Sequence, residues 1–423
     1  MTPPDGVEAP PDKVAHLLKA LYGLKQSGRS WYGELTDILV EQLHFDRTDS
    51  DACLFIITVK FDNGDFIRLN VHVDDCAATY KSKAFYKAFM AELERILRKH
   101  IKSDGSVLSI ADDKDVYLGM TVQRLPDGAI KLHQARYTED ILARYNHLDA
   151  KPASTPYLSG DPLCKEDSPK TKEDREKVEG IPYKSLVGSV LHLSRSTRPD
   201  ISCAVAILAK YQKDPGPRHW EAAKRLLRYL SGTRDFGIIY GRDRTKDGIP
   251  HSICHGWTDS DYAGDLDRRR SRSGYVYYAW GGPVSWTSAL QGCVALSSCQ
   301  AEYQAACEAA KEAIWLIRVC NDLGYEDTSI ETHSKLTQKE YEGEKPLTIF
   351  EDNQGCIELS KNPVHHKRSK HIETKYHYVR DEVMKGTIKL VKTHTDDDIS
   401  DIYTKALDKA TFIRHRDKLV AKN

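Results

Sequence analysis

The sequence has no excess of charge of either sign and no long apolar run. Lysine and arginine together number 62, and aspartate and glutamate also number 62. Any binding to nucleic acid therefore has to come from local patches, because no overall basic field attracts a polyanion. No apolar stretch approaches the roughly 20 residues of a membrane span, and the N-terminus lacks the hydrophobic core of a signal peptide. These absences predict an intracellular protein, cytoplasmic or nuclear, without a membrane partner.

Paired cysteines of the zinc-ribbon and redox types are also missing. The ten cysteines form no Cys-x-x-Cys pair, and they are scattered among apolar residues, as in reduced intracellular proteins. What the chain does have is length. Its 423 residues, of ordinary apolar content, leave room for two or three domains, each with its own core.

Two adjacent aspartates, Asp74 and Asp75, follow the β-prone run 69–73. Two anions a few ångströms apart repel each other, and a divalent cation relieves that repulsion. Mg²⁺ favours hard oxygen ligands together with substrate phosphates, and pairs of Mg²⁺ ions serve phosphoryl transfer in polymerases and nucleases. Taken alone, an Asp-Asp pair is more often an ordinary hairpin turn, so the rest of the chain has to decide.

The N-terminal third alternates helical and strand patterns. We expect an amphipathic helix within 14–44, strands at 53–59 and 66–73, a further helix after Tyr80, and a second hairpin from 116–125 and 129–133. This order suits an α+β, palm-like sheet.

The remainder reads as a connection followed by a new unit. Residues 157–180 are charged and poor in apolar side chains, which predicts an exposed linker, and 181–230 read as helical. From Ile253 the expected order is three strands, a long helix (298–320), a strand (347–352), a short helix, a strand (387–393) and a final helix (399–407). A polar insertion occupies 325–346.

Four acids of this last unit stand at strand ends or on helix faces. Asp259 and Asp352 end apolar strands, and Asp401 lies in the first turn of the final helix. Glu302 shares a helical face with small apolar residues, which is unusual because a buried charge needs a partner. Singly, these acids have structural explanations, such as Asp401 meeting the helix dipole. Together, the element order would bring all four to one metal-binding end.

A series of short motifs runs through nearly the whole chain. In order they are Leu18–Gln26, His72–Asp75, Tyr117–Met120, Thr197–Ile201, Thr258–Asp265, Ala295–Ser298, Ala301–Tyr303, Asp352–Gln354, Lys370–Glu373 and Asp401–Lys405. The series resembles the C-terminal part of the Pol polyprotein of copia-type LTR retrotransposons, which is reverse transcriptase followed by ribonuclease H. One such motif would be weak, but the ordered series is specific.

The resemblance implies an α+β and α/β chain in three parts. A partial reverse-transcriptase palm and thumb would occupy residues 1–156, a charged linker and helical connection 157–252, and an independent ribonuclease H-like domain 253–423. The family usually has Tyr at the position of His72 and Pro at that of Gly28. The first six residues resemble a stretch that follows the family's first polymerase aspartate, so we expect an incomplete polymerase without activity of its own.

The resemblance also implies roles for particular residues. Asp74 and Asp75 would be polymerase metal ligands, and Gln26 would lie beside the incoming nucleotide. Asp259, Glu302, Asp352 and Asp401 would hold Mg²⁺ or Mn²⁺ and cleave RNA in an RNA–DNA hybrid by two-metal phosphodiester hydrolysis. The implied partners are that hybrid and an RNA template with a DNA primer. The alternative is a catalytically silent retroelement relic that acts only as a nucleic-acid-binding or interaction module.

The densest basic patch is 365–371. Lys367, Arg368, Lys370 and His371 are predicted to contact the phosphates of a hybrid, and the alternative is a solvated loop. The resemblance implies that His394 is a mobile general-base or product-release residue near the last acid, and the alternative is an exposed strand-end residue. The aromatic residues Trp257, Tyr262 and Tyr275 are expected to pack in the core rather than stack on bases.

Overall fold

A computed structural model describes residues 20–21, 23–58, 64–101, 108, 116–250, 254–325, 346–361 and 374–422. The chain forms two compact units, residues 1–113 and 114–423. The division of the sequence at 156/157 and 252/253 into functional domains stays a prediction. All ten cysteines carry free thiols, and no described helix is both long and apolar enough to cross a membrane.

The N-terminal unit is an antiparallel sheet packed against helices. Strands β1 (Asp46–Arg47), β2 (Leu54–Thr58), β3 (Phe66–His72) and β4 (Asp75–Tyr80) pair in sequence order, and the helical elements are α1 (Ser27–Asp37), η1 (Ile38–Gln42) and α2 (Lys83–Ile101). Alternate side chains of β3 are buried, as expected for a strand with one covered face. They share a core with Leu35 of α1 and with Phe89 and Leu93 of α2. The predicted pairing of β2 with β3 and the helix after Tyr80 are therefore confirmed.

The second unit begins with an antiparallel sheet whose last strand follows a helical segment in the sequence. Strands β5 (Val116–Tyr117), β6 (Met120–Arg124), β7 (Ile130–His133) and β8 (Gly237–Tyr240) are antiparallel, and the helices are α3 (Ala135–Arg144), α4 (Lys172–Val178), α5 (Tyr183–Ser196), α6 (Ser202–Ala209) and α7 (Pro217–Gly232). The helical prediction for 181–230 is confirmed. Residues 157–180 are not an exposed linker throughout, because Tyr157 and Leu163 are buried in the core beneath these helices.

A five-stranded mixed sheet forms the rest of the second unit. Its strand order is β11-β10-β9-β12-β13. The elements are β9 (Cys254–Asp261), β10 (Arg272–Ala279), β11 (Gly282–Leu290), α8 (Ser298–Asp322), β12 (Leu347–Glu351), α9 (Gln354–Lys361), α11 (Tyr378–Met384), β13 (Ile388–Lys392), α12 (Asp401–Thr404) and α13 (Lys409–Leu419). The first three strands are antiparallel, whereas β12 and β13 run parallel to β9. The predicted order of the strands and the long helix α8 is confirmed, but two helices, α9 and α11, stand where one short helix was predicted.

The final helix differs from the prediction for 399–407. The structure has a single turn, α12, and then α13, which begins where the Asp408 side chain accepts hydrogen bonds from the backbone N–H groups of Ala410 and Thr411. The apolar residues of α13 are few, and most of the helix is polar or charged, so no helix was predicted there.

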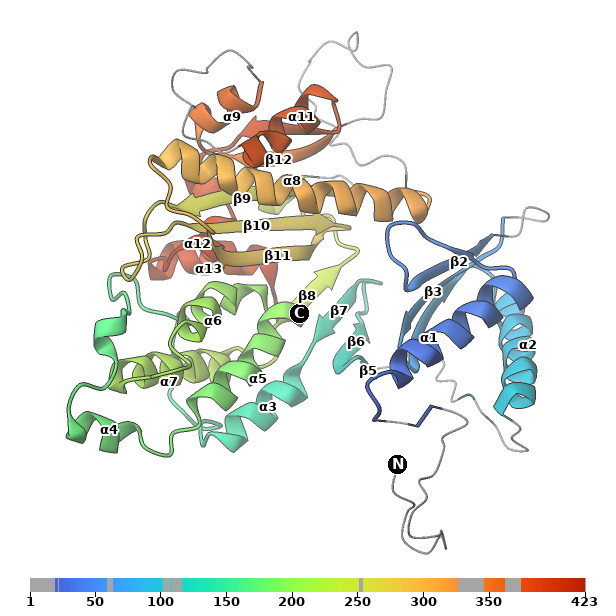
Figure 1. The fold of residues 1–423 in the computed structure, drawn as a ribbon, viewed down its shortest axis with the longest axis horizontal. Coiled ribbons are helices and arrows are strands. Elements are labelled where there is room, and N and C mark those ends of the chain that lie inside the picture. Colours follow the sequence, from blue (N-terminus) through green and yellow to red (C-terminus); the bar gives the residue numbers. More distant parts are fainter. Residues whose placement is uncertain are drawn as a thin grey trace, which may run out of the picture. The chain divides into compact units, whose positions relative to one another are not determined.

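Both faces of the five-stranded sheet are covered (Figure 1). One face packs against α8, α9 and α11, and the opposite face packs against α12 and α13 together with the helices of the connection. Successive residues of β10 divide between the two cores, with Tyr277 in the first and Val276 and Tyr278 in the second. The connection and the sheet therefore share one hydrophobic core.

Candidate metal centre

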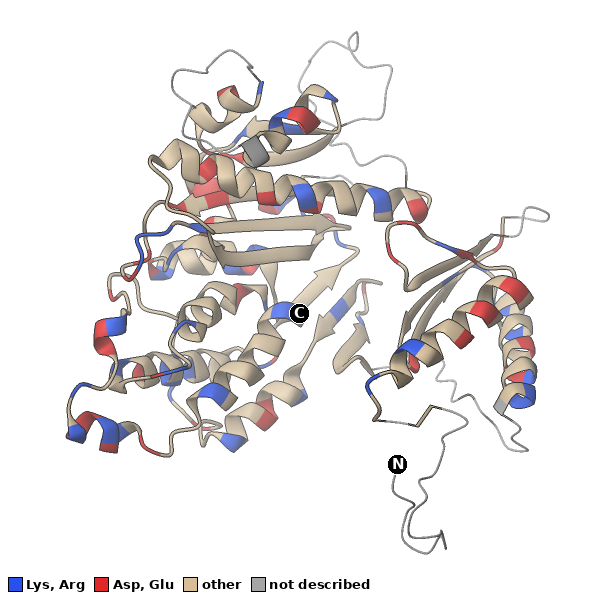
Figure 2. Cartoon of the chain, in the orientation of Figure 1, with Lys and Arg blue, Asp and Glu red and all other residues tan. Residues whose placement is uncertain are grey.

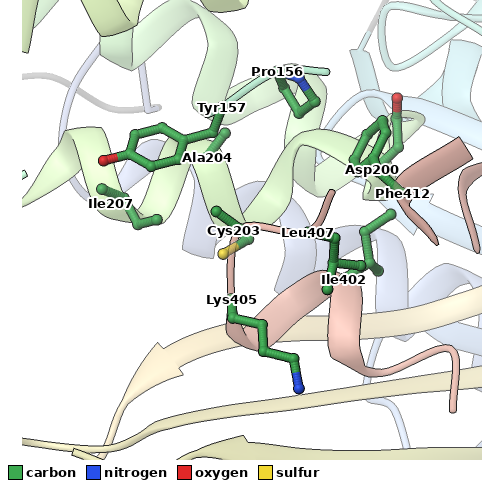
Figure 3. Close-up of a pocket in the computed structure, with 11 residues that line it drawn as sticks. Pro156, Tyr157, Asp200, Cys203, Ala204, Ile207, Ile402, Lys405, Leu407 and Phe412 are labelled. Atoms are coloured by element: carbon green, nitrogen blue, oxygen red, sulfur yellow. The ribbon is translucent and has the colours of Figure 1, made fainter. Parts of the chain in front are cut away.

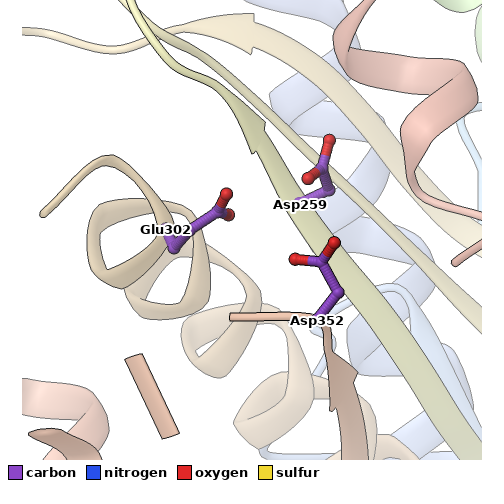
Figure 4. A group of neighbouring side chains, drawn as sticks. All are labelled: Asp259, Glu302 and Asp352. Atoms are coloured by element: carbon purple, nitrogen blue, oxygen red, sulfur yellow. The ribbon is translucent and has the colours of Figure 1, made fainter. Parts of the chain in front are cut away.

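Three carboxylates from three elements converge at one end of the five-stranded sheet (Figure 4). Asp259 lies near the end of β9, Asp352 directly follows β12, and Glu302 lies in the second turn of α8. Strands β9 and β12 are adjacent, and Phe350 is in register with Trp257, so Asp352 comes level with Asp259. One oxygen from each of Asp259, Glu302 and Asp352 lies within 4.8 Å of the other two.

Burial makes it unfavourable for the carboxyl groups of this cluster to carry their negative charges together. Asp259 and Glu302 are almost completely buried. Burial raises the pKa of Glu302 to about 11, and the nearby carboxylates of Glu351 and Asp259 add to the rise. The Oε2 atom of Glu302 is buried and accepts no hydrogen bond. A buried carboxyl oxygen without a donor, facing two other acids, suits a divalent cation, whose charge would favour the ionised form.

Asp401, the fourth predicted acid, approaches Asp259 from the opposite face of the sheet. Its neighbour Thr404 donates a hydrogen bond from Oγ1 to Asp259 Oδ2 at 2.5 Å. Burial raises the pKa of Asp401 to about 7, with Asp259 adding to the rise, while Lys405 lowers it through an ion pair of 2.6 Å to Asp401 Oδ1. Asp401 therefore lies beside the three converging carboxylates, and its negative charge is paired with the positive charge of Lys405.

A glycine permits this approach. Gly274 of β10 is the cross-strand partner of Asp259. A Cβ atom at this position would lie 2.7 Å from Thr404 Cγ2 and 2.8 Å from Tyr403 Cβ. Helix α12 occupies the space that a side chain at position 274 would fill. Gly274 therefore sets how close Asp401 and Thr404 come to Asp259.

Two further acids of the site were not predicted from the sequence. Glu351 and Asp398 are fully buried, and one carboxyl oxygen of each accepts no hydrogen bond. Burial raises the pKa of both well above its usual range, and Asp259 adds to each rise. The sequence signal for Glu351 was its place beside Asp352 at a strand end, whereas Asp398 is hidden within the acidic run 396–398.

Asp352 and His394 lie at the edge of the acidic cluster, where Asp352 is half-buried and His394 is exposed. Thr395 donates a hydrogen bond from Oγ1 to Asp352 Oδ2 at 2.7 Å, which fixes that carboxylate from the loop after β13. The ring of His394 is largely exposed and accepts a hydrogen bond from the backbone N–H of Asp396 through Nδ1, at 3.2 Å. This position is compatible with either interpretation of His394.

The polymerase-type aspartates lie on a hairpin of the N-terminal unit. Asp74 is in the turn between β3 and β4, and Asp75 begins β4; both are exposed. Val73 adopts a left-handed backbone with φ of 56°, a strained conformation for a β-branched residue. Trp31 of α1 donates to the Val73 carbonyl at 2.7 Å, so α1 fixes the hairpin tip.

The structure does not assemble a metal-binding trio around these two aspartates from the residues it describes. Gln26 is exposed and immediately precedes α1. Lys367, Arg368, Lys370 and His371 lie outside the described residues.

A small hollow between the connection and α12 is not a second substrate site. Cys203 and Ala204 of α6 line it together with Ile402, Leu407 and Phe412, and the Lys405 side chain extends from its edge (Figure 3). Its volume of about 20 Å³ is room for about one water molecule, which excludes a nucleotide.

The fold is mixed α/β, with a cluster of three carboxylates at one end of its five-stranded sheet. A family model described as "Reverse transcriptase (RNA-dependent DNA polymerase)" matches residues 1–159. The chain is 36% identical over 97% of its length to the retrovirus-related Pol polyprotein from transposon TNT 1-94 of Nicotiana tabacum, and 35% identical over 95% to that from transposon RE2 of Arabidopsis thaliana. The chain belongs to the copia-type, retrovirus-related Pol polyproteins, as its motifs predicted.

The chain spans only 28% and 25% of the length of these two relatives. Among solved structures, ribonuclease H1 of Halobacterium salinarum matches 36% of this chain and 93% of its own, at 15% identity and a TM-score of 0.21. This likeness is too low to support an argument.

Proposed function

We propose that the second unit cleaves the RNA strand of an RNA–DNA hybrid by metal-assisted phosphodiester hydrolysis. The observation that carries the proposal is the convergence of Asp259, Glu302 and Asp352 within 4.8 Å, with a buried oxygen of Glu302 left without a donor. The membership in a family of transposon Pol polyproteins supports a nucleic-acid substrate.

The three carboxylates fit Mg²⁺ or Mn²⁺, since both prefer oxygen ligands. When bound, such ions would activate a water molecule and stabilise the departing oxygen of the cleaved bond. Asp259 is oriented by Thr404 and Asp352 by Thr395, so two ligands are positioned before substrate arrives. Lys405 balances Asp401. The protein would choose its substrate by the shape and 2′-hydroxyl groups of the hybrid rather than by base sequence.

The test is cleavage of a labelled RNA strand in a hybrid by the full chain with Mg²⁺ or Mn²⁺. Asp259→Asn removes a ligand charge at nearly constant volume, and we expect activity to fall by about 100-fold or more. Asp214→Asn, an exposed carboxylate that pairs loosely with Arg175 at 3.8 Å, is the matched control and should leave activity unchanged. Equal cleavage by wild type and Asp259→Asn would contradict the proposal. No cleavage by a folded wild type would favour the silent-relic alternative.

The match of residues 1–159 to a reverse-transcriptase family favours a second candidate function, polymerisation. Asp74 and Asp75 would be its metal ligands and Gln26 would lie beside the nucleotide. Since no third carboxylate joins the pair within the described residues, we expect no processive extension of a DNA primer on an RNA template by this chain. Primer extension that needs Mg²⁺ and disappears in Asp74→Asn would contradict this expectation.

A further inference from the structure

The loop of residues 262–271 carries three consecutive arginines beside the candidate metal centre. The loop joins β9, which ends at Asp261, to β10, which begins at Arg272. Figure 2 shows Lys and Arg gathered where the chain leaves the sheet at this end. Asp261 is the cross-strand partner of Arg272 and lies two residues after Asp259 on the same strand. The arginines and the acids therefore occupy the same end of the sheet.

This loop is held in a defined shape by its own polar groups. The buried carboxylate of Asp265 accepts the backbone N–H of Arg268 at 3.1 Å, and the Asp265 carbonyl accepts that of Arg269 at 2.7 Å. The N–H of Asp265 donates to the carbonyl of Arg270 at 3.1 Å. Arg269 is held in the left-handed region, with φ of 53°. Such strain persists only where the surroundings over-determine the backbone.

The helical connection braces the loop from outside the sheet. Lys210, which follows α6, forms an ion pair with Asp265 and another of 3.4 Å with Asp267. The Tyr211 hydroxyl donates to Asp267 at 3.2 Å, and the backbone N–H of Lys165 donates to the same side chain at 2.6 Å. The side chains of Asp265 and Asp267 are thus bound by groups of the helical connection and not by the side chains of Arg268 or Arg269.

The outward face of the loop suits a phosphate backbone. Arg268 and Arg269 are exposed and form no ion pair with any residue within the described ranges. Tyr262 is 45% exposed, so the sequence expectation that it packs in the core is wrong. A guanidinium offers bidentate donors to phosphate oxygens, and an exposed aromatic ring in the same loop would provide a surface for sugar or base.

We propose that the loop 262–271 is a phosphate-binding clamp, in which Arg268 and Arg269 hold the backbone of an RNA–DNA hybrid next to the acids. This inference rests on the proposed function for its choice of nucleic acid. It adds a binding surface to which the sequence motifs, including the overlapping Thr258–Asp265, assigned no role. It also gives Lys210, through Asp265, a positioning role, because that pair fixes the direction in which the arginines project.

The test is binding of a fluorescent hybrid to the full chain, in an Asp259→Asn background so that the RNA stays intact. Replacing Arg268 and Arg269 together by Gln should weaken binding about tenfold at 0.1 M salt. The slope of log affinity against log salt should flatten by about 1 for each phosphate that the protein no longer neutralises. The double change of Lys172 and Lys177 to Gln removes the same charge from the exposed side chains of α4 and should alter neither quantity. Equal effects of the two double variants would overturn the clamp in favour of a diffuse charge effect.

Asp265→Asn keeps both arginines but removes their anchor, so it should also weaken hybrid binding while the melting temperature shows that the chain is folded. Unchanged binding in both this variant and the arginine variant would overturn the inference. Arginine-dependent binding without any cleavage by the wild-type chain would keep the clamp and overturn the proposed nuclease. If the wild-type chain cleaved the hybrid but its affinity and salt slope did not change in the arginine variant, the nuclease would stand and the clamp would be overturned.

Discussion

At the scale of single residues, the acidic cluster favours protons in the absence of metal. Burial and mutual repulsion raise the pKa of Glu302 from its ordinary 4.5 to about 11, and that of Asp401 from 3.8 to about 7. Between the ordinary and the raised value, the folded chain binds a proton that the unfolded chain has released. The free energy of unfolding therefore falls as pH rises from about 4 toward 7 through Asp401, and it continues to fall above that through Glu302.

Metal binding should reverse this trend, because carboxylate ligands bind a cation only without their protons. We expect Mg²⁺ or Mn²⁺ to raise the melting temperature of the full chain more at pH 8 than at pH 5.5. Glu302→Gln should reduce the metal-induced rise at pH 8 and should flatten the metal-free decline in stability above pH 4.5. A metal-induced rise that is equal at the two pH values, or unchanged in Glu302→Gln, would count against the proposed ligand.

At the scale of elements, the contact between α12 and the sheet decides whether Asp401 reaches the site. That contact depends on Gly274, where a Cβ would meet Thr404 and Tyr403 at less than 3 Å. The neighbouring atoms belong to a backbone-anchored turn, so the space cannot be regained by turning a flexible side chain.

Gly274→Ala should displace α12 and lower the stability by about 1–3 kcal/mol, and it should also weaken the response of the melting temperature to metal. Thermal unfolding with and without Mg²⁺ measures both effects. Gly188→Ala is the control, since no heavy atom lies within 4 Å of its Cβ and alanine favours the α5 helix by up to about 1 kcal/mol. A neutral Gly274→Ala would show that α12 does not need this close approach.

At the scale of the whole molecule, the helical connection belongs structurally to the sheet that bears the acids. Trp286 of β11 donates from Nε1 to the Ser194 carbonyl of α5 at 2.7 Å. The core that contains Trp257 and Tyr403 also contains Leu193 and Val205 of the connection. A chain limited to 253–423 would expose this apolar face to water.

We therefore expect residues 114–423 to unfold cooperatively when produced alone, whereas residues 253–423 should aggregate or lack fixed tertiary packing. Near-ultraviolet circular dichroism and gel filtration of the two pieces measure this difference. If the shorter piece showed native-like packing as a monomer, the sequence prediction of an independent unit from residue 253 would stand.

The sequence by itself determined the order of the strands along the last unit, its long helix, and the four acids that stand at its strand ends and helix faces. These are local properties, since periodicity and strand length depend on near neighbours along the chain. Only the tertiary structure decided that Glu351 and Asp398 join the acids and that Asp401 is paired with Lys405. It also decided that Tyr157 and Leu163 of the expected linker are buried. Burial and electrostatic pairing arise from residues far apart in the sequence, such as Asp259 and Thr404, so no local pattern reports them.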